Sequence, residues 1–170
     1  MTRGKGRFFS DNLGEIASGR PNLGQYVPVS IYRMMQYTIR DVLSLEYGED
    51  LARKIIYKAG KLAGEKFCRE YLDTSLDFTS FVTELKNLLI EMKIGILRIE
   101  ELDLENMNLV LTIAEDLDCS GLPVTEETVC VYDEGFIAGI LKAYTGQDFI
   151  VKEVDCWASG DTVCRFHISQ

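Results

Sequence analysis

The stretch MNLVLTIA, residues 107–114, decides the fold class of this chain. Its apolar residues alternate with other residues at a period of two, which is typical of a β-strand and not of a helix. Residues 96–104 precede it, and Glu105-Asn106 forms a plausible turn between the two segments. The sequence therefore predicts a β-hairpin here.

Three helices are predicted before this hairpin, because apolar residues recur there at helical spacing. The first begins after Pro28 and ends at Gly48, the second covers about residues 49–72, and the third covers about residues 78–93 with Gly95 as its C-cap. We expect all three apolar stripes to face the core. The stripes are Ile31, Met35, Ile39 and Val42, then Ala52, Ile56, Ala59, Ala63, Phe67 and Tyr71, then Phe81, Leu85, Leu88 and Met92.

A looser segment, residues 116–125, leads to a fourth predicted helix that ends near Gly146. A second hairpin is predicted from residues 149–156 and 162–168. Residues 1–27 form an N-terminal arm in which Leu13 to Ser18 is a candidate edge strand. The predicted architecture is α+β, a single domain over residues 28–170 with helices packed on an antiparallel sheet of about four or five strands.

Composition excludes several classes of protein. The net charge of −9 and the isoelectric point near 4.7 argue against a nucleic-acid-binding surface, which needs clustered Lys and Arg. No apolar run approaches the roughly 18–20 residues that span a bilayer, and the first ten residues lack the apolar core of a secretory signal. We therefore expect a cytoplasmic protein, in which disulfides between its five cysteines are disfavoured.

The segment EVDCWASGDTVCRF, residues 153–166, raises three alternatives for its two cysteines: a disulfide, a metal site, or two small buried hydrophobes. A loop with an odd number of residues would place Cys156 opposite Cys164, close enough for both thiolates to bind one Zn²⁺. Glu153 would lie on the other face of a regular strand, so it joins them only through a bulge or if Cys156 has left the strand. Cys130, near the start of the fourth helix, is the natural further ligand.

Two other residues are candidates with a weaker case. Cys119, in the looser segment, is either a spare ligand or an ordinary thiol. His167 is the only histidine, and on a strand it would alternate away from Cys164, so we expect it to stay outside the site. The sequence leaves open whether either residue replaces one of the four ligands.

The run CVYDEGFIAG (residues 130–139), the Glu153-x-x-Cys156 spacing, Gly160-Asp161 and CRF (164–166) resemble the 4-vinyl reductase domain family, in particular its stand-alone archaeal hydrocarbon-binding members. Residues 28–114 agree with that family in pattern only. The resemblance implies a fold shared with TRAPP trafficking subunits and haem-based nitric-oxide sensors. In aromatic-sensing relatives zinc is bound at spacings that match Cys130, Glu153, Cys156 and Cys164, which implies a structural zinc here.

The resemblance also implies a ligand pocket between helices and sheet. Five residues would serve either as core or as pocket lining: Tyr132, Phe136, Gly139, Trp157 and Phe166. The glycine pairs Gly60/Gly64 and Gly135/Gly139 each clear one helical face. Such a face allows close helix packing, the default in a domain of this kind, or leaves room for a ligand.

The leading hypothesis is a cytoplasmic domain that binds a small apolar or aromatic, hydrocarbon-like molecule, with a sensory or regulatory role. The alternatives are a reductase acting on a vinyl group of a tetrapyrrole-like substrate and a TRAPP-like interaction scaffold. The sequence shows no glycine-rich dinucleotide loop after a strand and no evident acid–base pair, so it gives the enzyme little support. It does not identify the ligand or a downstream signalling partner.

We also expect a homodimer, because the sheet can cover only some of the wide apolar stripes and because the family tends to pair through helices. Residues 31–46 and 49–72 are the expected contributors. Tyr32, Met34, Tyr37 and Leu43 flank the stripe of the first helix.

Overall fold

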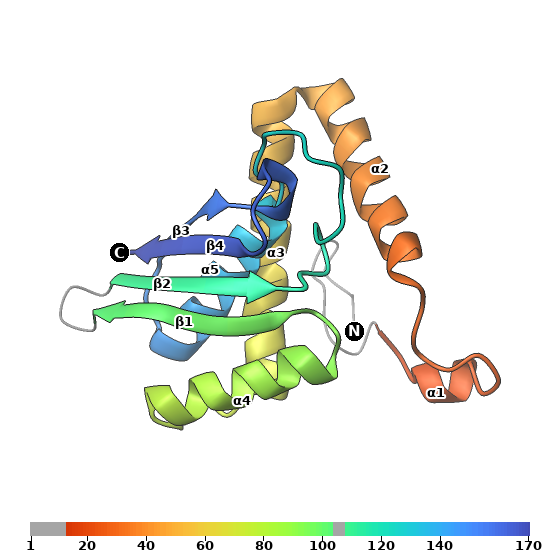
Figure 1. Cartoon of the computed structure of the whole chain (residues 1–170). Coiled ribbons are helices and arrows are strands. Elements are labelled where there is room, and N and C mark those ends of the chain that lie inside the picture. The colour runs from red at the N-terminus through yellow and green to blue at the C-terminus, as the bar shows by residue number, and fades with distance from the viewer. Residues whose placement is uncertain (1–12, 104–107) are drawn as a thin grey trace, which may run out of the picture.

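The computed structural model describes residues 13–103 and 108–170. Its elements lie in the order α1 (Ile16–Gly19), α2 (Val29–Tyr47), α3 (Glu49–Tyr71), α4 (Phe78–Glu91), β1 (Ile96–Asp103), β2 (Asn108–Ala114), α5 (Val131–Thr145), β3 (Ile150–Asp155), the 3₁₀ turn η2 (Trp157–Ser159) and β4 (Cys164–Ser169) (Figure 1).

The four strands form one antiparallel sheet in the order β1-β2-β4-β3. Leu111 in β2 pairs with Ile99 on one side and with Phe166 on the other, so the two predicted hairpins lie side by side. The predicted α+β class is confirmed, with four strands in the described residues. The predicted turn at Glu105-Asn106 falls outside the described residues.

Two helices, α3 and α5, cross at very short range. A Cβ atom added at Gly64 would lie 2.0 Å from the carbonyl oxygen of Phe136, and one added at Gly139 would lie 2.1 Å from that of Lys61. Gly60 and Gly135 meet the opposite backbone in the same way. The two glycine faces therefore serve close helix packing, and α5 lies between α3 and the sheet (Figure 1).

Helix α4 begins at an N-cap, since the Asp77 carboxylate accepts hydrogen bonds from the backbone N–H groups of Thr79 and Ser80. Its buried face, Phe81, Leu85 and Leu89, packs toward the sheet. Its C-terminus differs from the prediction, because the helix ends at Glu91 and Gly95 is not its cap.

The left-handed conformation near this terminus falls on Lys93, whose φ is 61°. Gly95 is required for a different reason. A Cβ atom there would lie 2.5 Å from Cγ2 of Ile113, so the glycine lets the start of β1 approach β2.

The predicted core-facing stripe of α2 is wrong. No residue of this helix is buried, and Ile31, Met35, Ile39 and Val42 are between 49% and 58% exposed. Figure 1 shows α2 projecting away from the sheet. The helix meets the rest of the chain through its opposite, polar face, because that face finds backbone carbonyls and a carboxylate to bind.

Four side chains make these contacts with the loop after β2. Tyr32 donates to Asp118 Oδ1 at 2.8 Å and Gln36 donates to Asp118 Oδ2 at 2.5 Å. Arg33 donates to the carbonyl oxygens of Leu117, Asp116 and Ser120, and Tyr37 donates to the carbonyl oxygen of Asp118. Tyr32 and Tyr37 thus face this loop, whereas Met34 is 59% exposed.

The stripe predicted for the second helix is partly buried. Ala52 is buried in α3, Phe67 packs against the core, and Ala59 and Tyr71 are exposed. The candidate edge strand at residues 13–18 is wrong, because Ile16–Gly19 forms the single helical turn α1. None of the helices in residues 13–103 and 108–170 combines the length and the apolar character needed to cross a bilayer.

Candidate functional site

Four buried cysteine sulfur atoms meet beside the sheet. They belong to Cys119, Cys130, Cys156 and Cys164, whose ligand atoms all lie within 4.8 Å of one another. The Sγ atom of Cys130 is 3.8 Å from those of Cys156 and Cys164, and Cys119 Sγ is 3.0 Å from Cys164 Sγ. All four side chains are at most 1% exposed, so the cluster is sealed from solvent.

Each cysteine comes from a different element. Cys119 lies in the loop after β2, Cys130 is the N-cap residue of α5, Cys156 follows β3, and Cys164 begins β4. Local hydrogen bonds fix the two loop positions. Asp116 Oδ1 accepts from the N–H groups of Asp118 and Cys119, and the Ser159 hydroxyl accepts from the Cys156 N–H. These turns aim both sulfur atoms at the centre.

The sulfur spacing fits a tetrahedral metal ion. A Zn–S bond of about 2.3 Å implies sulfur–sulfur separations of about 3.8 Å in a tetrahedron. Two of the measured separations equal that value, and the Cys119–Cys164 pair would have to open by less than an ångström. The donor set of four thiols is the one found in closed structural zinc sites.

The thiol pKa values point the same way. The pKa of Cys156 is lowered, because its sulfur accepts hydrogen bonds from Cys119 and then from Cys130 and Cys164. The pKa of Cys130 is raised by its hydrogen bonds to the same neighbours, Cys119 first, and by burial. A bare cluster therefore favours one thiolate among thiols, and a divalent cation would allow the rest to ionise.

Glu153 lies next to this cluster but outside the four sulfur atoms. The β3–β4 register shifts between Glu153 and Asp155, and Cys156 lies beyond the end of β3, so both conditions for bringing Glu153 near Cys156 are met. Glu153 Oε2 accepts a hydrogen bond from the Cys130 N–H at 2.9 Å, while buried Oε1 has no hydrogen-bond partner among the described residues. Burial raises the pKa of Glu153 to about 8.

The other two candidates fall on opposite sides of this boundary. Cys119, expected to be a spare ligand or an ordinary thiol, is a full member of the cluster. His167 is exposed and lies opposite Val110 in the β2–β4 ladder, and it is not among the clustered residues. Spacing alone did not single out Cys119, since the turn that presents it depends on the side chain of Asp116.

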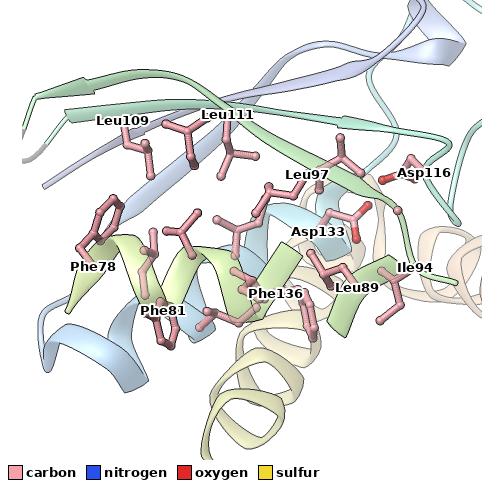
Figure 2. A pocket seen from close by; sticks show the side chains of 18 residues that line it. Phe78, Phe81, Leu89, Ile94, Leu97, Leu109, Leu111, Asp116, Asp133 and Phe136 are labelled. Carbon is pink, nitrogen blue, oxygen red and sulfur yellow. The ribbon is translucent and has the colours of Figure 1, made fainter. Parts of the chain in front are cut away.

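An apolar pocket of about 50 Å³ lies between the sheet and helices α4 and α5 (Figure 2). Aliphatic and aromatic side chains form almost all of its lining. Among them are Phe78, Phe81, Leu89, Leu97, Leu111 and Phe136. Ile113 also lines it and pairs with Cys164 in the ladder, so the pocket and the cysteine cluster share one strand pair.

The five residues expected to line a pocket are distributed over several places. Phe136 lines the apolar pocket. Gly139 faces Lys61 in the α3–α5 contact, and Tyr132 lines a shallow depression beside α2. The Trp157 indole N–H donates to the carbonyl oxygen of Leu122, and Phe166 is buried in the core.

Two carboxylates lie at one end of the pocket, where Figure 2 shows Asp116 and Asp133 directed toward one another. One oxygen of each lies within 4.8 Å of the other and of Cys130 Sγ. Desolvation by burial raises the pKa of both, that of Asp116 to about 7. The sequence analysis missed this pair, although Asp133 follows Cys130 by three positions and so lies on the same helical face.

Comparison with known proteins agrees with this fold and site. Residues 109–170 match the model of the 4-vinyl reductase domain. An uncharacterized protein of Methanocaldococcus jannaschii is 29% identical over 144 residues, which cover 85% of this chain and 76% of the relative.

Solved structures share the fold at low identity. A vinyl-4-reductase family protein from Methanocaldococcus jannaschii superposes with a TM-score of 0.63 at 19% identity, covering 99% of this chain and 98% of that one. The phenol-responsive sensory domain of the transcription activator PoxR, solved with phenol, gives 0.63 at 12% identity, with 86% and 76% covered.

A trafficking protein particle complex subunit 3 from Naegleria fowleri, covalently bound to palmitic acid, gives a TM-score of 0.59 at 12% identity, with 82% of this chain and 95% of that one covered. The class defined by fold and site is an α+β domain with an apolar pocket and a buried cysteine cluster. Over residues 109–170 the chain carries a 4-vinyl reductase domain, which confirms the resemblance stated from its sequence.

Proposed function

We propose that this chain is a binding module for a small apolar or aromatic molecule, held between α4, α5 and the sheet, with a sensory or regulatory role. The observation that carries the proposal is the apolar pocket itself, since an apolar cavity with few polar groups is the usual form of a small-molecule site. The phenol named with the PoxR sensory domain, which has the same fold, supports this assignment.

The pocket must enlarge to admit such a ligand. Its volume of about 50 Å³ is smaller than the roughly 150 Å³ of an engineered cavity that binds benzene. Helix α4 is the element whose displacement would enlarge it, because its buried face contributes Phe81, Leu85 and Leu89 to the lining. These contacts are apolar and non-directional, so the helix can shift without breaking hydrogen bonds to the sheet.

The test is binding of benzene, toluene and hexane to the metal-loaded protein, followed by thermal shift and calorimetry. We expect a ligand-dependent rise in melting temperature, because a ligand that binds only the folded state stabilises it. Leu97→Phe, which fills the pocket, should abolish the rise, whereas Ile150→Phe on the exposed face of β3 should keep it. Equal responses of the two variants, or no response of the unmodified protein, would reject the pocket.

We infer a structural role for zinc at the cysteine cluster. Four thiolates around one Zn²⁺ fill its coordination sphere, so no position remains for a reactive water. The metal would join the loop after β2, the start of α5 and both strands of the second hairpin, and its binding energy would add to the stability of the fold.

We also propose that the module is a homodimer that pairs through α2. This helix presents an apolar face to solvent, including Ile31, Met35 and Val42, while its polar face binds its own domain. A helix of 19 residues is roughly 28 Å long, enough for an isologous helix pair. The cytoplasmic location, the reductase and the TRAPP-like scaffold remain alternatives or expectations that binding and turnover assays must separate.

A further inference from the structure

The two carboxylates at the end of the apolar pocket are not explained by the pocket or by the cysteine cluster. Asp133 Oδ2 is inaccessible to solvent and has no hydrogen-bond partner among the described residues. Asp116 is buried, and its Oδ1 accepts two backbone N–H groups. Neither carboxylate forms an ion pair within residues 13–103 and 108–170.

The surroundings of this pair are electronegative. Cys130 Sγ lies within 4.8 Å of both carboxylates, and a zinc ion bound by four thiolates would leave a net charge of about −2 beside them. The cation bound to this loop is Arg33, and its guanidinium donates to the backbone carbonyls of residues 116, 117 and 120. A buried charge without a partner is strongly unfavourable, so the site is built to receive a positive donor.

We propose that the pocket binds an amine: a ligand with an apolar body between α4 and the sheet and a protonated amino group that donates hydrogen bonds to Asp133 and Asp116. This proposal rests on the proposed function, since it assigns the head-group chemistry of the same pocket. The apolar lining accommodates the body, and the carboxylate pair at its end lies where the head would stop (Figure 2).

The experiment uses three probes with one body, namely hexylamine, hexanol and hexanoate, with the metal-loaded protein at neutral pH. We expect hexylamine to bind at least about ten-fold more tightly than hexanol, because hydrogen bonds between charged partners are the stronger ones. Hexanoate should not bind, since its carboxylate would meet two like charges.

Two variants locate the head group. Asp133→Asn and Asp116→Asn should each remove about ten-fold of the preference for hexylamine while hexanol binding is retained. Glu91→Gln, at an exposed position at the end of α4, is the matched control and should change nothing. Metal content and melting temperature of each variant establish that it is folded, and either aspartate variant alone suffices if the other fails to fold.

Three outcomes separate the levels of the proposal. If none of the probes binds, and benzene and toluene also fail, the proposed pocket is rejected. Equal binding of hexylamine and hexanol, or an amine preference that survives both aspartate variants or disappears in 0.5 M NaCl, rejects the amine head group and leaves the apolar pocket standing. Displacement of hexylamine by Mg²⁺, Ca²⁺ or Mn²⁺ alone would assign the carboxylates to a metal ion and also reject it.

Discussion

The Sγ atoms of Cys119 and Cys164 lie 3.0 Å apart, although 45 positions separate the two residues in the chain. Cys119 stands in a loop and Cys164 begins a central strand of the sheet. This contact makes the loop after β2 a wall of the cysteine cluster, and it offers a fourth sulfur in the position that the sequence assigned to Glu153.

The first prediction separates these two candidates for the fourth ligand. Cys119→Ser should lower zinc affinity more than Glu153→Gln, because it removes a direct ligand, whereas Glu153 bonds the Cys130 N–H and acts around the site. X-ray absorption of the zinc-loaded protein should show four sulfur neighbours, and three in Cys119→Ser. Cys68→Ser, which alters a buried cysteine outside the cluster, is the control and should keep four.

A spectrum of the unmodified protein with three sulfur neighbours and one oxygen would instead favour the original set of Cys130, Glu153, Cys156 and Cys164. Absence of bound zinc in protein prepared without chelator, together with failure to reconstitute it, would reject the metal centre altogether.

The second prediction concerns removal of the metal. Chelation should raise amide hydrogen exchange in the loop of residues 116–130 and at the start of β4, because the metal would join these segments. The β1–β2 ladder should keep most of its protection, since its pairing from Leu97–Ile113 onward does not involve a cysteine cluster residue in β1. Uniform loss of protection over both hairpins would show that the metal supports the whole domain.

Local patterns predicted much of this structure because local physics determines it. The alternation of residues 107–114 predicted β2, and Gly146, in the left-handed conformation, ends α5 as expected. Cys130, Cys156 and Cys164 were placed correctly near one another by helix and hairpin geometry. These features require only the chain within a few residues of each site.

Features that depend on tertiary contacts could not be predicted in this way. Cys119 reaches the cluster through a turn held by Asp116, and α2 binds that loop with its polar face. An amphipathic pattern indicates that an apolar face is covered, but it does not say by what. For α2 the expected direction was therefore reversed. The carboxylates of Asp116 and Asp133 meet only because α5 lies against the loop.

The third prediction tests the contact between α3 and α5. Gly64→Ala and Gly139→Ala should each lower the free energy of unfolding by at least about 1–3 kcal/mol, because the added methyl group would meet a backbone carbonyl that cannot move aside alone. Gly19→Ala, where a Cβ atom has nothing within 4 Å, is the matched control and should be close to neutral. Denaturant unfolding followed by circular dichroism measures the difference, and a neutral Gly139→Ala would contradict the tight helix crossing.

The last prediction tests the outward face of α2. Met35→Glu places a charge in the exposed apolar stripe, so it should convert the proposed dimer to a monomer near 19.2 kDa in sedimentation equilibrium while the melting transition persists. Ile150→Glu makes the same kind of change at an exposed apolar residue of β3 and should leave the dimer intact. Tyr37→Phe removes the hydrogen bond to the Asp118 carbonyl oxygen, which should cost about 0.5–1.5 kcal/mol of stability without altering the mass. An unmodified protein that sediments as a monomer at micromolar concentration, or a dimer that survives Met35→Glu and dissociates with Ile150→Glu, would exclude α2 as the pairing surface.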